Sequence, residues 1–197
     1  TGLRLGASTS SLGHNGYVCI PANNRYYNAI KTPATYTDNR GVTVEFFLRI
    51  HELPGSGERH TIVSQGSSYS STAWSWEINL TPGGFAAGVP DGASLTVRFV
   101  TDNAAANFSK EFAENALRLN TDYQIRVKFN LQSAETGIAI DITDLESGTM
   151  VSQSMPSTSD GMLATNSPIY IGGVGQSGLT GTEASGAKAT IQDLRYW

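Results

Sequence analysis

Alternation of apolar and polar residues with a period of two is the dominant pattern along this chain. It is clearest over residues 42–50, where the even-numbered positions are all apolar: Val42, Val44, Phe46, Leu48 and Ile50. The positions between them are polar except for Phe47. Because successive side chains of a strand point to opposite faces, this segment predicts a strand with one buried and one solvated face. Such a strand is typical of an antiparallel sheet, since strands of parallel sheets are apolar on both faces.

Short strands separated by turn sequences follow along the whole chain. They are predicted at residues 3–5, 17–20, 61–65, 74–80, 85–89, 95–100, 125–129, 138–142, 168–171 and 189–197. In the last of these, Ile191 and Leu194 break the alternation and indicate a β-bulge. Turns at 82–84 and 90–92 predict that the segments 74–80, 85–89 and 95–100 form a meander. The pattern indicates an all-β, two-sheet antiparallel β-sandwich or jelly roll, and we predict one domain over residues 1–197.

One segment carries a different period. Between Asp102 and Leu119 the residues Phe108, Phe112 and Ala116 recur at a spacing close to that of a helix. Asn107 is a residue type suited to a helix N-cap. We therefore expect one or two turns of helix here, and at most one short helix in the chain.

Composition narrows the classes of partner. Charged residues make up 15 % of the chain and the formal net charge is −4, without any run of Lys or Arg. Nucleic-acid-binding proteins carry clustered positive charge, so we expect no nucleic-acid partner. No apolar stretch approaches the roughly 20 residues that span a bilayer, so membrane insertion is not expected either. Cys19 is the only cysteine and is predicted to be a buried, inert thiol.

Five short stretches resemble a known group of proteins: residues 15–21, 42–50, 120–129, 167–173 and 191–196. Their order along the chain is similar to that of the laminin-G-like and pentraxin-like branch of the concanavalin A-like lectin/glucanase superfamily. The resemblance implies a concanavalin A-like jelly roll. It implies less about activity, because that fold is used by lectins, hydrolases, lyases and adhesion modules.

The resemblance also bears on calcium. In calcium-binding relatives an aspartate begins the strand that here begins at Trp74, and the matching position falls on Trp74 or Ser75. Neither residue is a good ligand for a hard cation. Asp91 lies in the matching turn and Asn166 in the matching loop, so a rearranged calcium site stays open as the alternative. Our expectation is a domain without a cofactor or metal.

Carboxylates do not form a recognisable catalytic pair. Retaining glycosidases need two carboxylates about 5 to 5.5 Å apart on one face. Asp141 and Glu146 are five residues apart and would face opposite ways on a strand. The segment from Asp144 to Gly148 is better interpreted as an exposed hairpin, so no catalytic residue is assigned.

Two other patterns have simple explanations. His14, His51 and His60 lack a zinc-binding spacing and are interpreted as surface residues. Residues 173–178 fit the glycine pattern of dinucleotide-binding loops, but the Gly- and Thr-rich sequence after them does not predict the required helix. We interpret that segment as turns.

Aromatic residues give the candidate ligand site. Trp76 shares a predicted face with Ile78 and is expected in the core, whereas Trp74 begins the strand beside Tyr69. An aromatic ring can stack on the apolar face of a sugar while carboxylates and amides bind its hydroxyls. In the predicted meander, one rim of the sandwich gathers the candidate ligand-binding residues: Tyr69, Trp74, Asp91, Asp160 and Asn166.

These observations favour a non-catalytic recognition domain, carbohydrate-binding, in an extracellular or surface-exposed protein. Its partner would be a glycan or a protein surface, and the sequence leaves its oligomeric state open. The alternative is a structural or adhesive β-sandwich of a virion, filament or cell surface that binds protein partners. A glycoside hydrolase or polysaccharide lyase is the third hypothesis.

The calcium expectation can be tested by thermal unfolding. EDTA should leave the melting temperature unchanged, because a ligand stabilises a protein only when it binds the native state. A rise of several degrees in millimolar calcium would contradict this and would point to Asp91, Asp160 and Asn166 as ligands.

Overall fold

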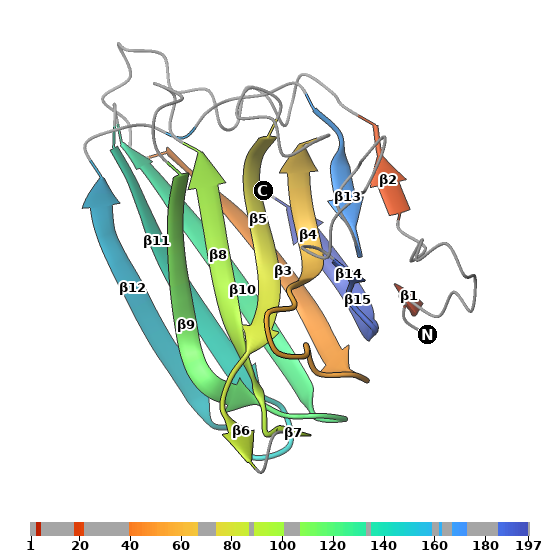
Figure 1. The fold of residues 1–197 in the computed structure, drawn as a ribbon. Coiled ribbons are helices and arrows are strands. Elements are labelled where there is room, and N and C mark those ends of the chain that lie inside the picture. The colour runs from red at the N-terminus through yellow and green to blue at the C-terminus, as the bar shows by residue number, and fades with distance from the viewer. Residues whose placement is uncertain are drawn as a thin grey trace.

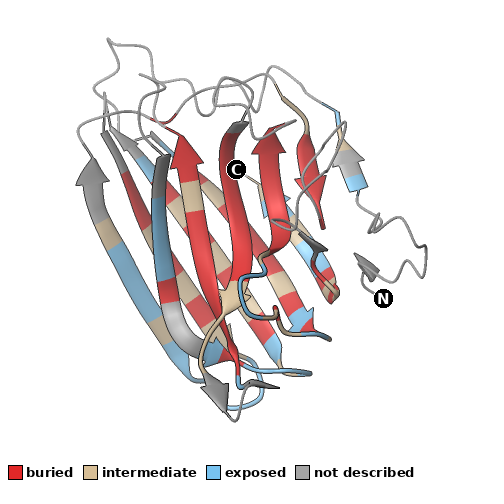
Figure 2. Cartoon of the chain, viewed as in Figure 1, coloured by how far each residue is buried: buried red, intermediate tan, exposed pale blue. Residues whose placement is uncertain are grey.

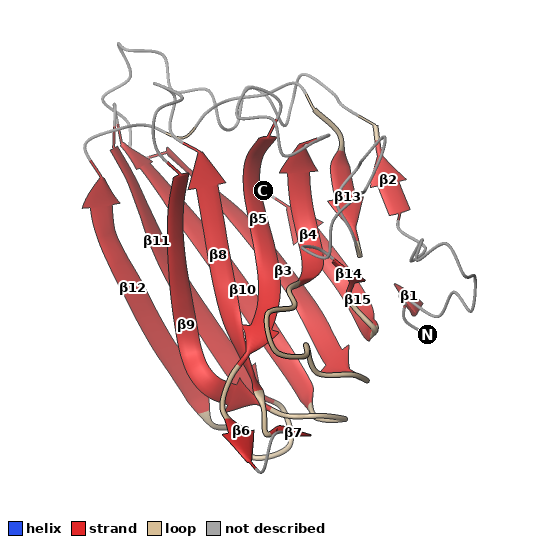
Figure 3. Cartoon of the chain, viewed as in Figure 1, coloured by secondary structure: helices blue, strands red, loops and turns tan. Residues whose placement is uncertain are grey.

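The computed structural model describes residues 3–4, 18–21, 40–66, 74–86, 89–100, 107–132, 135–158, 162, 167–172 and 185–196. Its regular elements are all β-strands: β1 (Leu3–Arg4), β2 (Val18–Ile20), β3 (Arg40–Ile50), β4 (His60–Gly66), β5 (Trp74–Pro82), β6 (Phe85–Ala86), β7 (Val89–Pro90), β8 (Ala93–Val100), β9 (Asn107–Leu117), β10 (Asp122–Gln132), β11 (Glu135–Asp144), β12 (Met150–Thr158), β13 (Ile169–Ile171), β14 (Ser185–Gly186) and β15 (Ala189–Tyr196). Among the described residues there is no helix (Figure 3).

The strands form two sheets packed face to face (Figure 1). The six-stranded sheet has the order β1-β15-β3-β10-β11-β12, and the seven-stranded sheet has the order β2-β13-β4-β5-β8-β9 with β14 added beside β4. All pairs are antiparallel except the short pair β14–β4. The predicted two-sheet β-sandwich is thus confirmed. In the described part of the chain, no helix is long and apolar enough to cross a membrane.

The core lies between the sheets, and its buried residues on the long strands come from β3, β4, β5, β8, β9, β10, β11 and β15 (Figure 2). The even-numbered residues of β3 from Val42 to Ile50 are at most 1 % exposed, as the alternation predicted. In β10 the residues Ile125, Val127 and Phe129 are also buried, and they lie opposite even-numbered residues of β3. Since this pairing aligns two apolar faces, it fixes which side chains of both strands point outward.

Trp76 connects the two sheets through the core. Its ring centroid lies 5.7 Å from that of Phe129 and 6.3 Å from that of Tyr196, both in the opposite sheet. The indole Nε1–H donates a hydrogen bond of 2.9 Å to Gln65 Oε1, so its polar atom is satisfied inside the core. The prediction that Trp76 is a core residue is confirmed.

Two predicted local features are present. The pairing of β15 with β3 shifts between Gln192 and Arg195, which is the bulge expected from the broken alternation. A turn joins β11 to β12, where Asp144 Oδ1 accepts hydrogen bonds from the backbone N–H groups of Glu146 and Ser147. These bonds, that of Ser147 first, lower the pKa of Asp144. The interpretation of residues 144–148 as a hairpin is confirmed.

The helix expected between Asp102 and Leu119 is wrong for residues 107–117, which form strand β9. A spacing of four residues suits a helix turn, but because four is even it also suits one face of a strand. Phe112 lies opposite Leu95 of β8 and is fully buried there. Pairing with β8 therefore decided between two periods that the sequence left equivalent.

The predicted meander is also wrong in one strand. β5 pairs directly with β8, from Trp76 opposite Phe99 to Pro82 opposite Ala93. The residues between them make the separate small hairpin β6–β7. It is held at its base because Gly83 N–H donates to Gly92 O and Asp91 N–H donates to Gly84 O. Asp91 consequently lies at the Pro82 end of β5, far from Trp74.

Two polar residues are more buried than expected. Glu45, predicted on the wet face of β3, is 5 % exposed, because Arg126 covers it and binds its carboxylate at 2.7 Å. His60, predicted at the surface, is 2 % exposed at the start of β4, with Nε2 3.5 Å from Glu58 Oε2. Burial lowers the pKa of His60 despite the opposing effect of Glu58. The burial of Glu45 and His60 therefore depends on neighbouring side chains, which the alternation of apolar and polar residues does not reveal.

The contrast between Phe46 and Glu45 can be measured by denaturant unfolding. Phe46→Ala should lower the free energy of unfolding by about 3 to 5 kcal/mol, because it leaves a cavity in the core. Glu45→Ala should cost about 1 to 2 kcal/mol, since it removes charge-assisted hydrogen bonds from Arg126 and Gln124. The exposure of Arg126 keeps this loss below that of a fully buried pair. A larger loss for Glu45→Ala than for Phe46→Ala would contradict the inward register of β3.

The buried histidine predicts a pH dependence of stability. Unfolded His60 takes up a proton near its ordinary pKa of 6.5, whereas the folded residue resists protonation until the pH falls further. The unfolded state then binds more protons, so the free energy of unfolding should decrease as the pH drops below about 6.5. His60→Gln should flatten the slope between pH 6.5 and 5 and leave it unchanged above pH 7. Equal slopes for both proteins below pH 6.5 would show that His60 does not contribute.

Candidate functional site

The outward face of β3 and its two neighbours forms a regular array of side chains. Phe47 lies opposite Gln124 of β10 and Gln192 of β15. The next outward row contains Arg49, which lies opposite Asp122 of β10 and Thr190 of β15. Because the even-numbered residues of β3 are committed to the core, these rows necessarily face away from the other sheet.

The β9–β10 and β11–β12 turns border the end of this array that contains Arg49 and Asp122. Asn120 adopts a positive φ of 56°, a conformation that asparagine tolerates better than most residues. Its N–H donates to Ile50 O at 2.8 Å, which docks the β9–β10 turn on the end of β3 and sets Asp122 beside Arg49. Leu145 N–H donates to Asp122 O at 2.9 Å, so the β11–β12 turn borders the same region.

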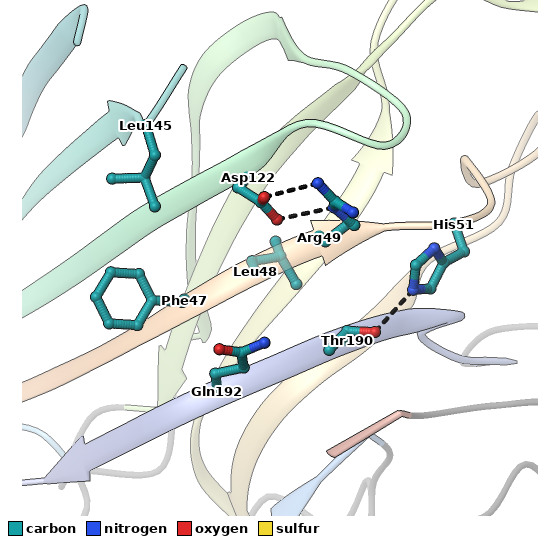
Figure 4. A pocket seen from close by; sticks show the side chains of 8 residues that line it. All are labelled: Phe47, Leu48, Arg49, His51, Asp122, Leu145, Thr190 and Gln192. Carbon is teal, nitrogen blue, oxygen red and sulfur yellow. Dashed lines mark hydrogen bonds and ion pairs between the residues drawn. The ribbon is translucent and has the colours of Figure 1, made fainter. Parts of the chain in front are cut away.

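A hollow lies over these rows (Figure 4). Its volume is about 440 Å³, and it is open to solvent. The residues that line it come from β3, β10, β15 and adjoining turns: Phe47, Leu48, Arg49, His51, Asp122, Leu145, Thr190 and Gln192. This volume falls within the range of roughly 300–1,000 Å³ that is typical of small-molecule sites.

Polar side chains in the hollow are held in defined positions (Figure 4). Arg49 donates from Nε to Asp122 Oδ1 at 2.8 Å and from Nη2 to Asp122 Oδ2 at 2.7 Å. His51 Nε2 and Thr190 Oγ1 are hydrogen-bonded at 2.8 Å. A two-pronged Arg–carboxylate contact fixes both groups in one plane. The hollow therefore presents oriented donors and acceptors beside the apolar surfaces of Phe47 and Leu145.

A ladder of ion pairs continues across the same face beyond the hollow. Arg126 Nε donates to Glu45 Oε2 at 2.7 Å, and this hydrogen bond is the main reason that the pKa of Glu45 is lowered. On β11, Asp141 accepts hydrogen bonds from Ser152 and Lys128, which in that order lower its pKa. These carboxylates are committed to partners and stay ionised at neutral pH, so they stabilise the face rather than offer a general acid.

The residues predicted for a ligand site do not all share one rim. Trp74 begins β5 and Asp91 lies beyond its other end. Nine residues at a rise of about 3.3 Å separate the two ends of β5 by roughly 26 Å. The expectation that Trp74 and Asp91 lie together is thus wrong, because it depended on the meander strand that is not formed. Asp91 is exposed beside the β6–β7 hairpin.

The remaining rim residues, Tyr69, Asp160 and Asn166, lie outside the described residues, as does the side chain of Trp74. Their role in binding stays a prediction. The hollow was not predicted, although the sequence carried one indication of it. Phe47 was the single apolar residue on the otherwise polar face of its strand. An aromatic residue at such a position does not pack in the core.

Within the described ranges, no group of three or more His, Cys, Asp or Glu side chains is placed to hold a metal ion. Ser75, one of the two residues at the position of the family's calcium-binding aspartate, is fully buried. Because Asp160 and Asn166 fall in undescribed segments, the expectation of a domain without a metal stays a prediction, and the EDTA experiment above tests it.

No protein-family profile matches this sequence, and no curated protein sequence matches it. Solved structures do. The LG1-3 region of the laminin alpha2 chain aligns with a TM-score of 0.55 at 12 % identity, over 91 % of this chain and 29 % of that one. Tailspike protein 2 of Escherichia coli O157:H7 bacteriophage CAB120 aligns with a TM-score of 0.55 at 11 % identity, over 92 % of this chain and 24 % of that one.

A third similar structure is botulinum neurotoxin type C, whose cell entry depends upon interaction with two ganglioside molecules. It aligns with a TM-score of 0.54 at 14 % identity, over 98 % of this chain and 38 % of that one. The chain thus spans less than half the length of each of these three structures. At such low identity the likeness concerns the fold, and the chain has the concanavalin A-like, laminin-G-like β-sandwich fold.

Proposed function

We propose that this domain is a non-catalytic carbohydrate-recognition module and that it binds sugar in the hollow on the outer face of the six-stranded sheet. The observation that carries the proposal is the combination of a part-exposed Phe47 ring with oriented polar groups at the edge of the same hollow. An extracellular or surface-exposed location is part of this proposal.

The chemistry of a pyranose fits this combination. One face of the sugar ring is apolar and stacks on an aromatic side chain, while its hydroxyls are both donors and acceptors. In the hollow, Asp122 offers acceptor oxygens, Arg49 offers N–H donors and Gln192 offers both. All three lie on paired strands, which hold the groups more rigidly than loops would.

Structural neighbours support a binding role without specifying it. The ganglioside interaction of botulinum neurotoxin type C concerns a glycan-bearing ligand, and the bacteriophage tailspike protein belongs to a virion. The same fold also carries enzymes, so the fold alone does not specify a role, and the support specific to this chain is its own hollow. Glu45 and Asp141 on the outer face are paired with cations or serine, which favours recognition over acid–base catalysis.

A glycan array with three variants tests the proposal. Phe47→Ala should weaken binding of any glycan found by about 1 kcal/mol or more, because it removes the stacking surface. Thr43→Ala, on the same strand and face but outside the hollow, is the matched control and should bind as the wild type does. Trp76→Ala should instead lower the melting temperature, since it empties the core.

A fourth variant separates the two candidate locations. If Trp74→Ala abolishes binding and Phe47→Ala does not, the ligand lies at the rim predicted from the sequence and the hollow is not the site. A domain that binds no glycan and self-associates on sizing would favour the structural or adhesive alternative. Release of sugar products from a polysaccharide would contradict the non-catalytic assignment.

A further inference from the structure

We propose, building on the carbohydrate-binding function above, that Asp122 determines specificity in the hollow. By binding Arg49 it makes the hollow select uncharged sugars and exclude acidic ones such as uronates. The class of glycan that is recognised would then depend on the charge arrangement of the Arg49–Asp122 pair.

Arg49 and Asp122 form a two-pronged ion pair with each other. Both carboxylate oxygens of Asp122 accept hydrogen bonds from one edge of the guanidinium, at 2.8 and 2.7 Å. The side chains are 45 % and 50 % exposed, so a ligand in the hollow can reach both. This two-pronged geometry is the one in which an arginine would otherwise bind the carboxylate of an acidic sugar. Asp122 therefore occupies one of the two edges of Arg49 at which a ligand carboxylate could bind, and it places a negative charge beside the other.

The charges in the hollow also favour neutral sugars over acidic ones. Arg49 and Asp122 contribute one positive and one negative charge, which cancel. An acidic sugar would have to displace Asp122 or bind the remaining edge of Arg49, where its carboxylate lies within a few ångströms of a like charge and is repelled by it. A neutral sugar faces neither cost, because its hydroxyls can donate to the outer lone pairs of Asp122 and accept from the free edge of Arg49.

Three cations of this face beyond the hollow are already paired with carboxylates. They are Arg126 with Glu45 at 2.7 Å, Lys128 with Asp141 at 3.0 Å and Arg195 with Asp193 at 3.2 Å. Because these cations are already neutralised, they cannot compensate for the repulsion from Asp122. The Arg49–Asp122 pair therefore determines how strongly an acidic ligand can bind in the hollow.

Asp122→Asn tests the inference with little change in shape. The variant keeps the size of the side chain but leaves Arg49 with an uncompensated charge. The probes are methyl glucoside and methyl glucuronide, and likewise methyl galactoside and methyl galacturonide, each pair differing at C6. Titrations are followed by the backbone amide shifts of Phe47 and Thr190. Asp141→Asn, a paired carboxylate on the same face outside the hollow, is the matched control.

We expect the wild type and Asp141→Asn to bind the neutral glycosides and to show no saturable shift with the acidic ones. Asp122→Asn should bind the acidic glycosides about tenfold or more tightly than the wild type does, because a charge-assisted hydrogen bond becomes available. Equal binding of acidic and neutral glycosides by the wild type would overturn the inference. So would an Asp122→Asn variant that gains no affinity for the acidic ones.

A sulfate titration keeps this test independent of the proposed function. If neither type of glycoside shifts the wild-type amides, the hollow is not a sugar site and the proposed function fails. The sulfate titration then tests the Arg49–Asp122 pair independently of any sugar. A response at Arg49 in Asp122→Asn that is absent in the wild type supports the role of Asp122 in excluding anions, whereas the same response in both proteins contradicts it.

Discussion

The pairing of β3 with β10 is the constraint on which the rest of this structure depends. Val44 lies opposite Val127 and Phe46 opposite Ile125, so two apolar faces enter the core together. A shift of one residue would move every one of these side chains to the solvent face. The same register sends Phe47, Arg49 and Asp122 outward in adjacent positions. The core and the hollow are therefore two results of a single strand alignment.

Trp76 extends this constraint to the second sheet. The indole belongs to β5 and reaches Phe129 and Tyr196 across the core, with its N–H satisfied by Gln65. A large aromatic side chain that contacts both layers links their relative position to its own packing. The outer faces can then carry polar and charged groups without weakening the contact between sheets.

Charged residues are few in this chain, and those described above on the outer face are arranged as ion pairs. Glu45 is nearly buried and Asp141 half-buried, and both are held ionised by neighbours that donate hydrogen bonds. The pairs of Glu45 with Arg126 and of Asp141 with Lys128 are formed across strands, because residues opposite one another on adjacent strands are the closest neighbours in a sheet. Under the function that we propose, a face with its charges matched in this way would favour neutral partners and offer oriented polar groups for recognition.

The sequence by itself determined the β-sandwich, the inward face of β3, β10 and β11, the bulge in β15 and the hairpin at residues 144–148, because each depends on local alternation or turn chemistry. It also marked Phe47 as an exception. Tertiary structure alone decided that residues 107–117 form a strand, since a four-residue spacing suits both periods and only pairing with β8 distinguishes them. It likewise set the direct pairing of β5 with β8, which separates Asp91 from Trp74. The hollow joins residues from β3, β10 and β15 that are 68 or more positions apart in the sequence, such as Asp122 and Thr190. Contacts over such separations depend on strand order, which local patterns do not encode.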